Sequence, residues 1–221
     1  MHNIQEKVRK ESPKPPFCTA TFQQEAANKL GLKVKDAMSC AQKLYEGINV
    51  NGEHIGLITY MRTDDTTFAD EFIPELKNYV ETTFGAGQYN NPRTGKKTGG
   101  EQNGHEALRV VDPSMTPELL AEHLSNELLI KVYKLIWQRT IASVLPDALY
   151  NERIYTINNK EHLFKLTDKA LAQAGYLEIY GKTPVELSTK LPQLGEELQD
   201  TEIYFEAKTT SPKPRYTEAT L

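Results

Sequence analysis

The 221-residue sequence has little of what marks secreted, membrane or metal-clamped proteins. It contains only two cysteines, Cys18 and Cys40, and neither belongs to a Cys-x-x-Cys motif or has partners at metal-ligand spacing. Two unpatterned thiols fit a reducing compartment. No apolar run approaches 18 residues, and no apolar signal-peptide region follows the first residues. We therefore expect a cytoplasmic protein with no membrane partner.

The sequence also lacks an excess of basic charge. The formal net charge is -4, with 38% hydrophobic and 25% charged residues, an ordinary composition for a soluble globular protein. Any contact with nucleic acid must therefore come from a local patch. The length allows one large domain or two modest ones, with a sizeable core.

Apolar periodicity divides the chain into a helical block and a β block. Apolar residues recur at three and four along residues 34–48, and capping signals mark helix starts at Thr21 and Thr116, with a stop at Gly31. Pro74 indicates that a helix expected over about 67–84 begins late, near Ile73. A further helix is expected over about 126–144. Strands are expected at 55–64, 150–157, 163–166, 171–180 and 203–207.

The predicted fold class is therefore α+β, with four segments. Residues 1–19 are expected to form a hinge arm, 20–146 a helical domain, 147–210 a β-rich domain portion and 211–221 a return hinge segment. The first and last segments share a Pro-Lys-Pro element followed by an aromatic residue and a Thr. The order helix, helix, turn, strand in the helical block is typical of winged-helix or helix-turn-helix units.

The stretch at 56–64, G-L-I-T-Y-M-R-T-D, is the first candidate site. If it is extended, Tyr60 and Arg62 lie on the same side because side chains alternate along a strand. A phenol can act as a covalent nucleophile, and a guanidinium offers parallel donors to a phosphate. By spacing alone, a packed tyrosine beside a surface arginine remains the alternative.

A second candidate region runs from 85 to 109. The Gly- and Asn-rich loop at 85–104 carries Arg93, Lys96 and Lys97, which either contact a DNA backbone or are solvated. On a helical turn, His105 and Arg109 would share a face and could bind a phosphate, or His105 could be structural. This is not a zinc motif, since Arg109 stands where a second histidine would be needed.

Six segments together resemble type IA DNA topoisomerases, the bacterial topoisomerase I branch. They are P-F-C-T-A-T-F-Q-Q-E at 16–25, A-Q-K-L-Y-E at 41–46, G-L-I-T-Y-M-R-T-D at 56–64, G-H-E-A-L-R at 104–109, L-I-W-Q-R at 135–139 and P-R-Y-T-E-A-T-L at 214–221. The resemblance implies a winged-helix, CAP-like domain carrying the active-site tyrosine, inserted into part of a β-rich hinge domain.

The resemblance also implies roles for the matched residues. Tyr60 would attack a DNA phosphodiester and hold the 5′ phosphate while a strand passes, and Arg62 would orient and stabilise that phosphate. His105, Arg109 and Thr59 would help to bind the DNA. The implied partner is single-stranded DNA, with association with the nucleoid.

The sequence departs from the family pattern in two ways. Asp65 replaces the usual Ser, which adds a negative charge near the expected DNA. Moreover, the Asp-x-Asp pair with which the family's Toprim domain holds Mg²⁺ is absent. We therefore expect no cofactor or metal in this chain, Mg²⁺ in the full-length enzyme, and the Toprim and other domains of the same polypeptide as partners. By itself the chain is expected not to relax supercoils.

Two other functions fit the same residues. One is a non-catalytic single-stranded DNA-binding module that uses the helix-turn-helix-like unit. The other is a structural or partner-binding domain in which Tyr60 is only a core residue. The low net basicity counts against strong independent binding of DNA.

Overall fold

The computed structural model describes residues 3–50, 52–92, 105–189, 191–198, 206–212 and 215–217. Contacts divide the chain into two compact units. The first, here the sheet unit, combines Met1–Ser12 with Asp147–Arg215. The second, here the helical unit, combines Pro13–Pro146 with Tyr216–Leu221.

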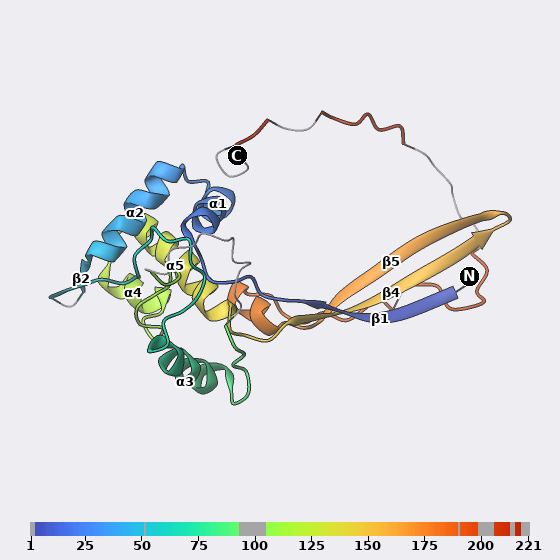
Figure 1. The fold of residues 1–221 in the computed structure, drawn as a ribbon. Coiled ribbons are helices and arrows are strands. Elements are labelled where there is room, and N and C mark those ends of the chain that lie inside the picture. Colours follow the sequence, from blue (N-terminus) through green and yellow to red (C-terminus); the bar gives the residue numbers. More distant parts are fainter. Residues whose placement is uncertain are drawn as a thin grey trace. The chain divides into compact units, whose positions relative to one another are not determined.

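The helical unit is built around α5 (Glu127–Ala142), which contacts α1 (Thr19–Leu30), α2 (Val34–Glu46) and α4 (Pro117–His123). Figure 1 shows these helices together, with α3 (Phe72–Phe84) nearby. Burial of large apolar side chains is the main stabilising contribution to such a unit. The largest fully buried ones include Tyr133, Phe17, Phe22, Leu44, Ile58, Met61, Leu108, Leu120 and Ile136.

Most helix limits follow the capping signals. Gly31 ends α1 with a φ of 66°, and the Thr116 side chain accepts a hydrogen bond from the Leu119 amide at the start of α4. Helix α3 begins at Phe72, so Pro74 lies in its first turn, where its missing N–H is tolerated. Helix α1 begins at Thr19, two residues before the predicted start.

The strand predicted over 55–64 is wrong beyond Ile55. Strands β2 (Ile48–Val50) and β3 (Glu53–Ile55) form a short antiparallel hairpin. The chain then leaves the hairpin because the Leu57 amide donates to the Leu44 carbonyl in the last turn of α2, 2.8 Å away. From there the backbone is irregular, with one isolated bridge between Ile58 and Val110.

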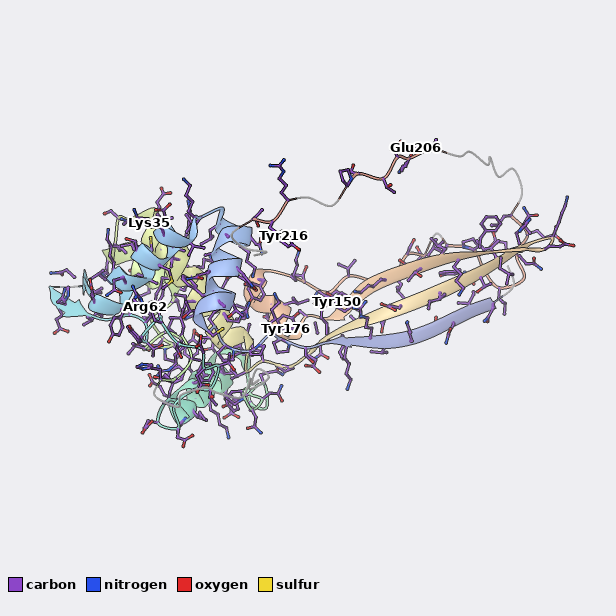
Figure 2. All side chains as sticks on the ribbon, turned by 45° about the horizontal axis from the view of Figure 1, so that its top comes forward. Lys35, Arg62, Tyr150, Tyr176, Glu206 and Tyr216 are labelled. Atoms are coloured by element: carbon purple, nitrogen blue, oxygen red, sulfur yellow. The ribbon has the colours of Figure 1, made fainter. Side chains whose placement is uncertain are left out.

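The sheet unit is a three-stranded antiparallel sheet in the order β1-β4-β5. Its strands are β1 (Asn3–Glu11), β4 (Ala148–Asn159) and β5 (His162–Gln173). The hinge arm predicted at the start of the chain is therefore largely a strand. Almost all residues of this strand are exposed, so the sequence has no alternation of apolar and polar residues that would predict it. A small core forms at one end of the sheet, where Tyr150 and Tyr176 lie near each other (Figure 2).

The structure also differs from the strands predicted in the β block. The strand expected over 171–180 ends at Gln173, and Gly175–Tyr180 is a 3₁₀ helix. The turn between β4 and β5 lies at Lys160 and Glu161, and Lys160 takes a φ of 56°. Ala207 is not in a strand.

Some predictions fall outside the described residues. They concern the basic side chains of the loop, Arg93, Lys96 and Lys97, most of the strand expected over 203–207, and the second Pro-Lys-Pro element. The mixture of helices and strands agrees with the predicted class, whereas the winged-helix, CAP-like arrangement remains a prediction. Among the described residues, no helix is long and apolar enough to cross a bilayer.

Candidate active site

Burial alternates along the segment that carries Tyr60, although the segment is not a regular strand. Met61 is fully buried and Thr63 is 5% exposed, whereas Arg62 and Asp64 are exposed. Tyr60 is partly buried and packs against the core of the helical unit. This alternation puts Arg62 and Asp64 on the outer side of the segment, and Tyr60 has the same parity.

The Tyr60 ring lies between two other rings. Its centroid is 5.3 Å from that of Tyr45, in an edge-on arrangement, and 5.1 Å from that of His105. Aromatic pairs at such distances are attractive beyond the area they bury. The fold thus brings His105, which is distant in the sequence, next to the candidate nucleophile.

The His105 ring also lines a hollow of about 620 Å³, whereas Tyr60 is not among the lining residues. Arg62 and His105 both line it, and the remaining lining residues are Thr19, Gln23, Met38, Thr63, Asp64 and Asp65. The Arg62 guanidinium makes no hydrogen bond or ion pair with any residue that the structure describes. Figure 2 labels Arg62 on the helical unit. An exposed, unpaired guanidinium at a hollow can bind an anion such as a phosphate.

Asp65 is the charge expected to weaken phosphate binding. One of its carboxylate oxygens accepts hydrogen bonds from the Thr67 amide, at 2.7 Å, and from the Thr67 hydroxyl. These bonds form a local turn of the kind that short carboxylates stabilise. The charge nevertheless lines the hollow, together with the exposed Asp64.

Arg109 does not line the hollow, and its side chain is instead engaged in contacts within the helical unit. It is 9% exposed, and its Nε and Nη2 donate to the two carboxylate oxygens of Glu106 at 2.7 and 2.9 Å. Nη1 donates to the Val110 carbonyl, and the guanidinium lies 3.6 Å from the centre of the Phe72 ring. The predicted contact of Arg109 with DNA has no support in this geometry.

Residues 105–109 do not form the helical turn on which His105 and Arg109 would share a face. The segment is irregular, and Leu108 forms an isolated bridge with Phe17. Its backbone is held by such bridges to other parts of the chain, which sequence periodicity does not report.

Thr59 joins the two segments of the site. Its hydroxyl donates to the Ala107 carbonyl at 2.8 Å and accepts from the Arg109 amide at 3.0 Å, and its own amide donates to the Arg109 carbonyl. These bonds hold the segment that begins at His105 beside the segment of Tyr60. Since the hydroxyl is already engaged, the predicted contact of Thr59 with DNA has no support either.

Several residues shape the site although no pattern in the sequence predicted a role for them. Thr19 bonds to the backbone beside Arg62, Gln23 and Met38 line the hollow, and Glu106 holds Arg109. Thr19 and Gln23 fall in the segment 16–25 that carries part of the family resemblance. That resemblance is the signal that could have pointed to them.

The described residues do not fit a magnesium site. Among them, no group of three or more His, Cys, Asp or Glu side chains is arranged to hold a metal ion. Mg²⁺ prefers several oxygen ligands in octahedral geometry. No step of the chemistry is therefore assigned to a metal bound by this chain.

Comparisons with known proteins identify the family to which the chain belongs. A family model for DNA topoisomerase matches residues 1–221. DNA topoisomerase 1 of Rickettsia felis is 38% identical over 99% of this chain and 29% of that protein. The Campylobacter jejuni protein of the same name is 34% identical over 99% of the chain and 31% of its own length.

A solved structure agrees with these relatives. The full-length topoisomerase I of Thermotoga maritima superposes with a TM-score of 0.74 at 32% identity, over 99% of this chain and 35% of that one. The chain thus spans about a third of the length of the proteins that it matches. By sequence and by fold, the chain belongs to the bacterial DNA topoisomerase I family, the type IA topoisomerases.

Proposed function

We propose that this chain carries the nucleophilic part of a type IA topoisomerase active site, and that Tyr60 is the nucleophile. The observation that carries the proposal is a hollow lined by Arg62 and His105, with the Tyr60 ring packed against the His105 ring at 5.1 Å between centroids. Arg62 has no hydrogen-bond or ion-pair partner among the described residues. Membership of the family supports the same assignment.

The proposed reaction is a transesterification at phosphorus. The Tyr60 phenolic oxygen forms a bond to the phosphorus of a DNA phosphodiester, and the bond to the 3′ oxygen of the preceding nucleotide breaks. The phenol loses its proton, and the departing 3′ oxygen gains one. The 5′ phosphate stays on Tyr60 while a strand passes, and attack by the 3′ hydroxyl reverses the step. Because the ester bond energy is conserved, resealing needs no nucleotide.

Arg62 and His105 contribute binding and charge stabilisation. A guanidinium keeps its charge throughout the reaction and can donate two parallel hydrogen bonds to the phosphate oxygens. Donors placed where negative charge develops lower the barrier more than they stabilise the ground state. We assign the clamping of the scissile phosphate to Arg62, and contact with the adjoining DNA to His105.

The rest of the proposal concerns the whole enzyme. Single-stranded DNA is the substrate, and Mg²⁺ is held by other domains of the polypeptide, the Toprim domain in particular. Those domains also supply the groups that move the protons of the phenol and of the 3′ oxygen. Action in the nucleoid follows from this substrate.

A trapping experiment tests the nucleophile. The chain is mixed with a Toprim-containing portion of a topoisomerase I, Mg²⁺ and a single-stranded oligonucleotide that is labelled at its 5′ end or, in a parallel sample, at its 3′ end, and then denatured. The covalent adduct should carry the segment downstream of the break, so a 3′ label reports it and the 5′ label reports the released piece. We expect Tyr60→Phe to abolish the adduct, because phenylalanine has no oxygen to form the ester.

The matched control is Tyr79→Phe, which removes a hydroxyl from α3, away from the hollow, and should leave the adduct unchanged. An adduct that persists in Tyr60→Phe would contradict the assignment. Binding of the oligonucleotide without any adduct in the unaltered chain would favour the non-catalytic DNA-binding module.

A further inference from the structure

Thr19, the first residue of α1, bonds to the backbone on both sides of Arg62. Its hydroxyl lies 2.8 Å from the Met61 carbonyl and 3.0 Å from the Thr63 carbonyl, and it accepts the Thr63 amide at 2.8 Å. The Thr19 amide also donates to the Thr63 carbonyl at 2.8 Å. One residue therefore makes contacts with both neighbours of Arg62. We call this set of hydrogen bonds the Thr19 latch.

The latch replaces the support that a sheet would give. Among the described residues, one isolated bridge, at Ile58, pairs residues 56–64 with another extended segment, and it lies before Tyr60. On that side the Thr59 hydroxyl holds the segment to Ala107, and on the other side the Thr19 latch holds it to α1. Tyr60, Met61 and Arg62 lie between these two anchors.

The side chains beneath the latch are buried, so its polar groups cannot easily turn to water. Met61 is fully buried and Thr63 is 5% exposed. A buried carbonyl or amide that loses its partner costs more than an exposed one, since no solvent replaces the bond. This asymmetry makes the hydroxyl of Thr19, more than its methyl group, the feature that fixes the backbone.

We propose that Thr19 is a positioning residue, which acts through Arg62 by holding the backbone from which the guanidinium reaches the scissile phosphate. This inference rests on the function proposed above. The Arg62 side chain is exposed and has no described partner, so only its backbone anchor limits where it can reach. A displacement of about 1 Å in a positioning element can cost on the order of 100-fold in rate.

The first test uses the 221-residue chain alone and measures the strength of the hydrogen bonds in the Thr19 latch. Amide hydrogen exchange, followed by NMR, is compared in the unaltered chain, Thr19→Val, Thr19→Ser and Thr21→Val. Valine keeps the shape and removes the hydroxyl, and serine keeps the hydroxyl. The Thr21 hydroxyl bonds to Cys18 within the same turn, so Thr21→Val is a matched control.

We expect the Thr63 amide to exchange about tenfold faster in Thr19→Val, since it loses its acceptor, and to remain protected in the other two variants. An unchanged Thr63 exchange rate in Thr19→Val would overturn the proposal. So would an equal increase in Thr21→Val, because that result would point to fraying of α1 alone.

The second test reads the effect on chemistry in the trapping experiment described above. Thr19→Val should slow adduct formation by roughly 10- to 100-fold, and Thr19→Ser should restore most of the rate. In an Arg62→Ala background, Thr19→Val should cause little further loss, because residues that act as one unit are not additive. An equal loss with and without Arg62 would overturn the proposal.

The two tests separate this inference from the proposed function. If the unaltered chain forms no adduct, the proposed function fails, and with it the catalytic meaning of the latch. The exchange rate of the Thr63 amide still decides whether Thr19 holds the Arg62 backbone. If the adduct forms and Thr19→Val leaves both its rate and the exchange unchanged, only the positioning role fails.

Discussion

The surroundings of three arginines give them different roles in the helical unit. Arg109 and Arg139 are buried, each paired with a glutamate and each over an aromatic ring, at 3.6 Å from Phe72 and 4.2 Å from Phe17 respectively. Arg62 is exposed at the hollow and has no described partner. A buried guanidinium needs its partners to offset desolvation, so the two paired arginines serve the fold. Arg62, which has no such partner in the described part of the chain, is available to a ligand.

The ion pair of Arg139 should be important for stability. Glu25, 8% exposed, bonds to Arg139 and to the ammonium groups of Lys14 and Lys29. Replacing it as Glu25→Gln leaves the buried Arg139 charge without a counter-ion, and we expect a loss of about 3–5 kcal/mol in unfolding free energy. Urea denaturation followed by circular dichroism measures this loss. The matched control, Lys14→Met, removes an exposed partner and should cost at most about 1 kcal/mol. Equal losses of unfolding free energy in the two variants would contradict a stabilising role for the ion pair of Glu25 and Arg139.

The same carboxylate predicts a dependence of stability on pH. Burial by itself would raise the pKa of Glu25, but hydrogen bonds from Lys14 and Lys29 and the charge of Arg139 outweigh it and lower the pKa from 4.5 to about 2. Because the folded-state pKa is depressed, the stabilisation is present above about pH 4.5 and is lost as the pH falls towards 2. The unaltered chain should lose up to about 3 kcal/mol over this range, and Glu25→Gln should lose less. If the unfolding free energy of both proteins fell equally as the pH is lowered, Glu25 would not be the cause of the pH dependence.

At the scale of elements, the end of α2 and the segment of Tyr60 meet through a glycine. A Cβ built on Gly56 would lie 2.8 Å from the Tyr45 carbonyl oxygen, closer than real contacts allow. Tyr45, in the last turn of α2, also packs edge-on against Tyr60. The glycine of the G-L-I-T-Y motif thus permits a close approach of two backbones. That approach places the candidate nucleophile against a helix.

Substituting this glycine tests the close approach. Gly56→Ala forces the Tyr45 carbonyl to move, and we expect a destabilisation of about 1–3 kcal/mol, the range for overpacked sites. Thermal unfolding by circular dichroism measures it. Lys35→Ala, at an exposed position of α2, is the control and should change stability by less than about 0.5 kcal/mol. A Gly56→Ala protein as stable as the control would show that the backbones can separate without cost.

At the scale of the whole molecule, the chain consists of two compact units, and the candidate site lies within one of them. Every residue that lines the hollow lies between Thr19 and His105, inside the helical unit. The sheet unit, built from the beginning of the chain and from residues after Asp147, contributes none of them. The candidate nucleophile and phosphate clamp thus both lie in the helical unit.

The chain alone should not perform the full topoisomerase reaction. The sequence contains no Asp-x-Asp pair, and the described residues offer no cluster of acidic side chains fit for Mg²⁺. We expect the 221 residues to leave a negatively supercoiled plasmid unrelaxed in the presence of Mg²⁺, as judged by agarose gel electrophoresis. A full-length topoisomerase I is the positive control. Relaxation by the chain that disappears in Tyr60→Phe would refute this expectation.

The helices could largely be read from the sequence, and the local geometry of the site could not. Periodicity and capping residues depend on neighbours within one turn, so Gly31, Pro74 and Thr116 marked their helix limits correctly. Strand β1 escaped prediction because it is almost wholly exposed and so lacks an apolar pattern. The segment after Ile55 escaped because its partners are α1, α2 and residues 107–111, none of them adjacent in the sequence.

The sequence by itself determined the family, because six short motifs in order are specific whatever the geometry around them, and it pointed to Tyr60 and Arg62 as the candidate nucleophile and phosphate clamp. Only the tertiary structure decided which polar groups are free to act. It occupied Thr59 and Arg109 with structural bonds, left Arg62 at a hollow without a partner among the described residues, and set His105 beside Tyr60. The Thr19 latch joins residues 44 positions apart. Such bonds depend on how elements pack, and no local pattern encodes them.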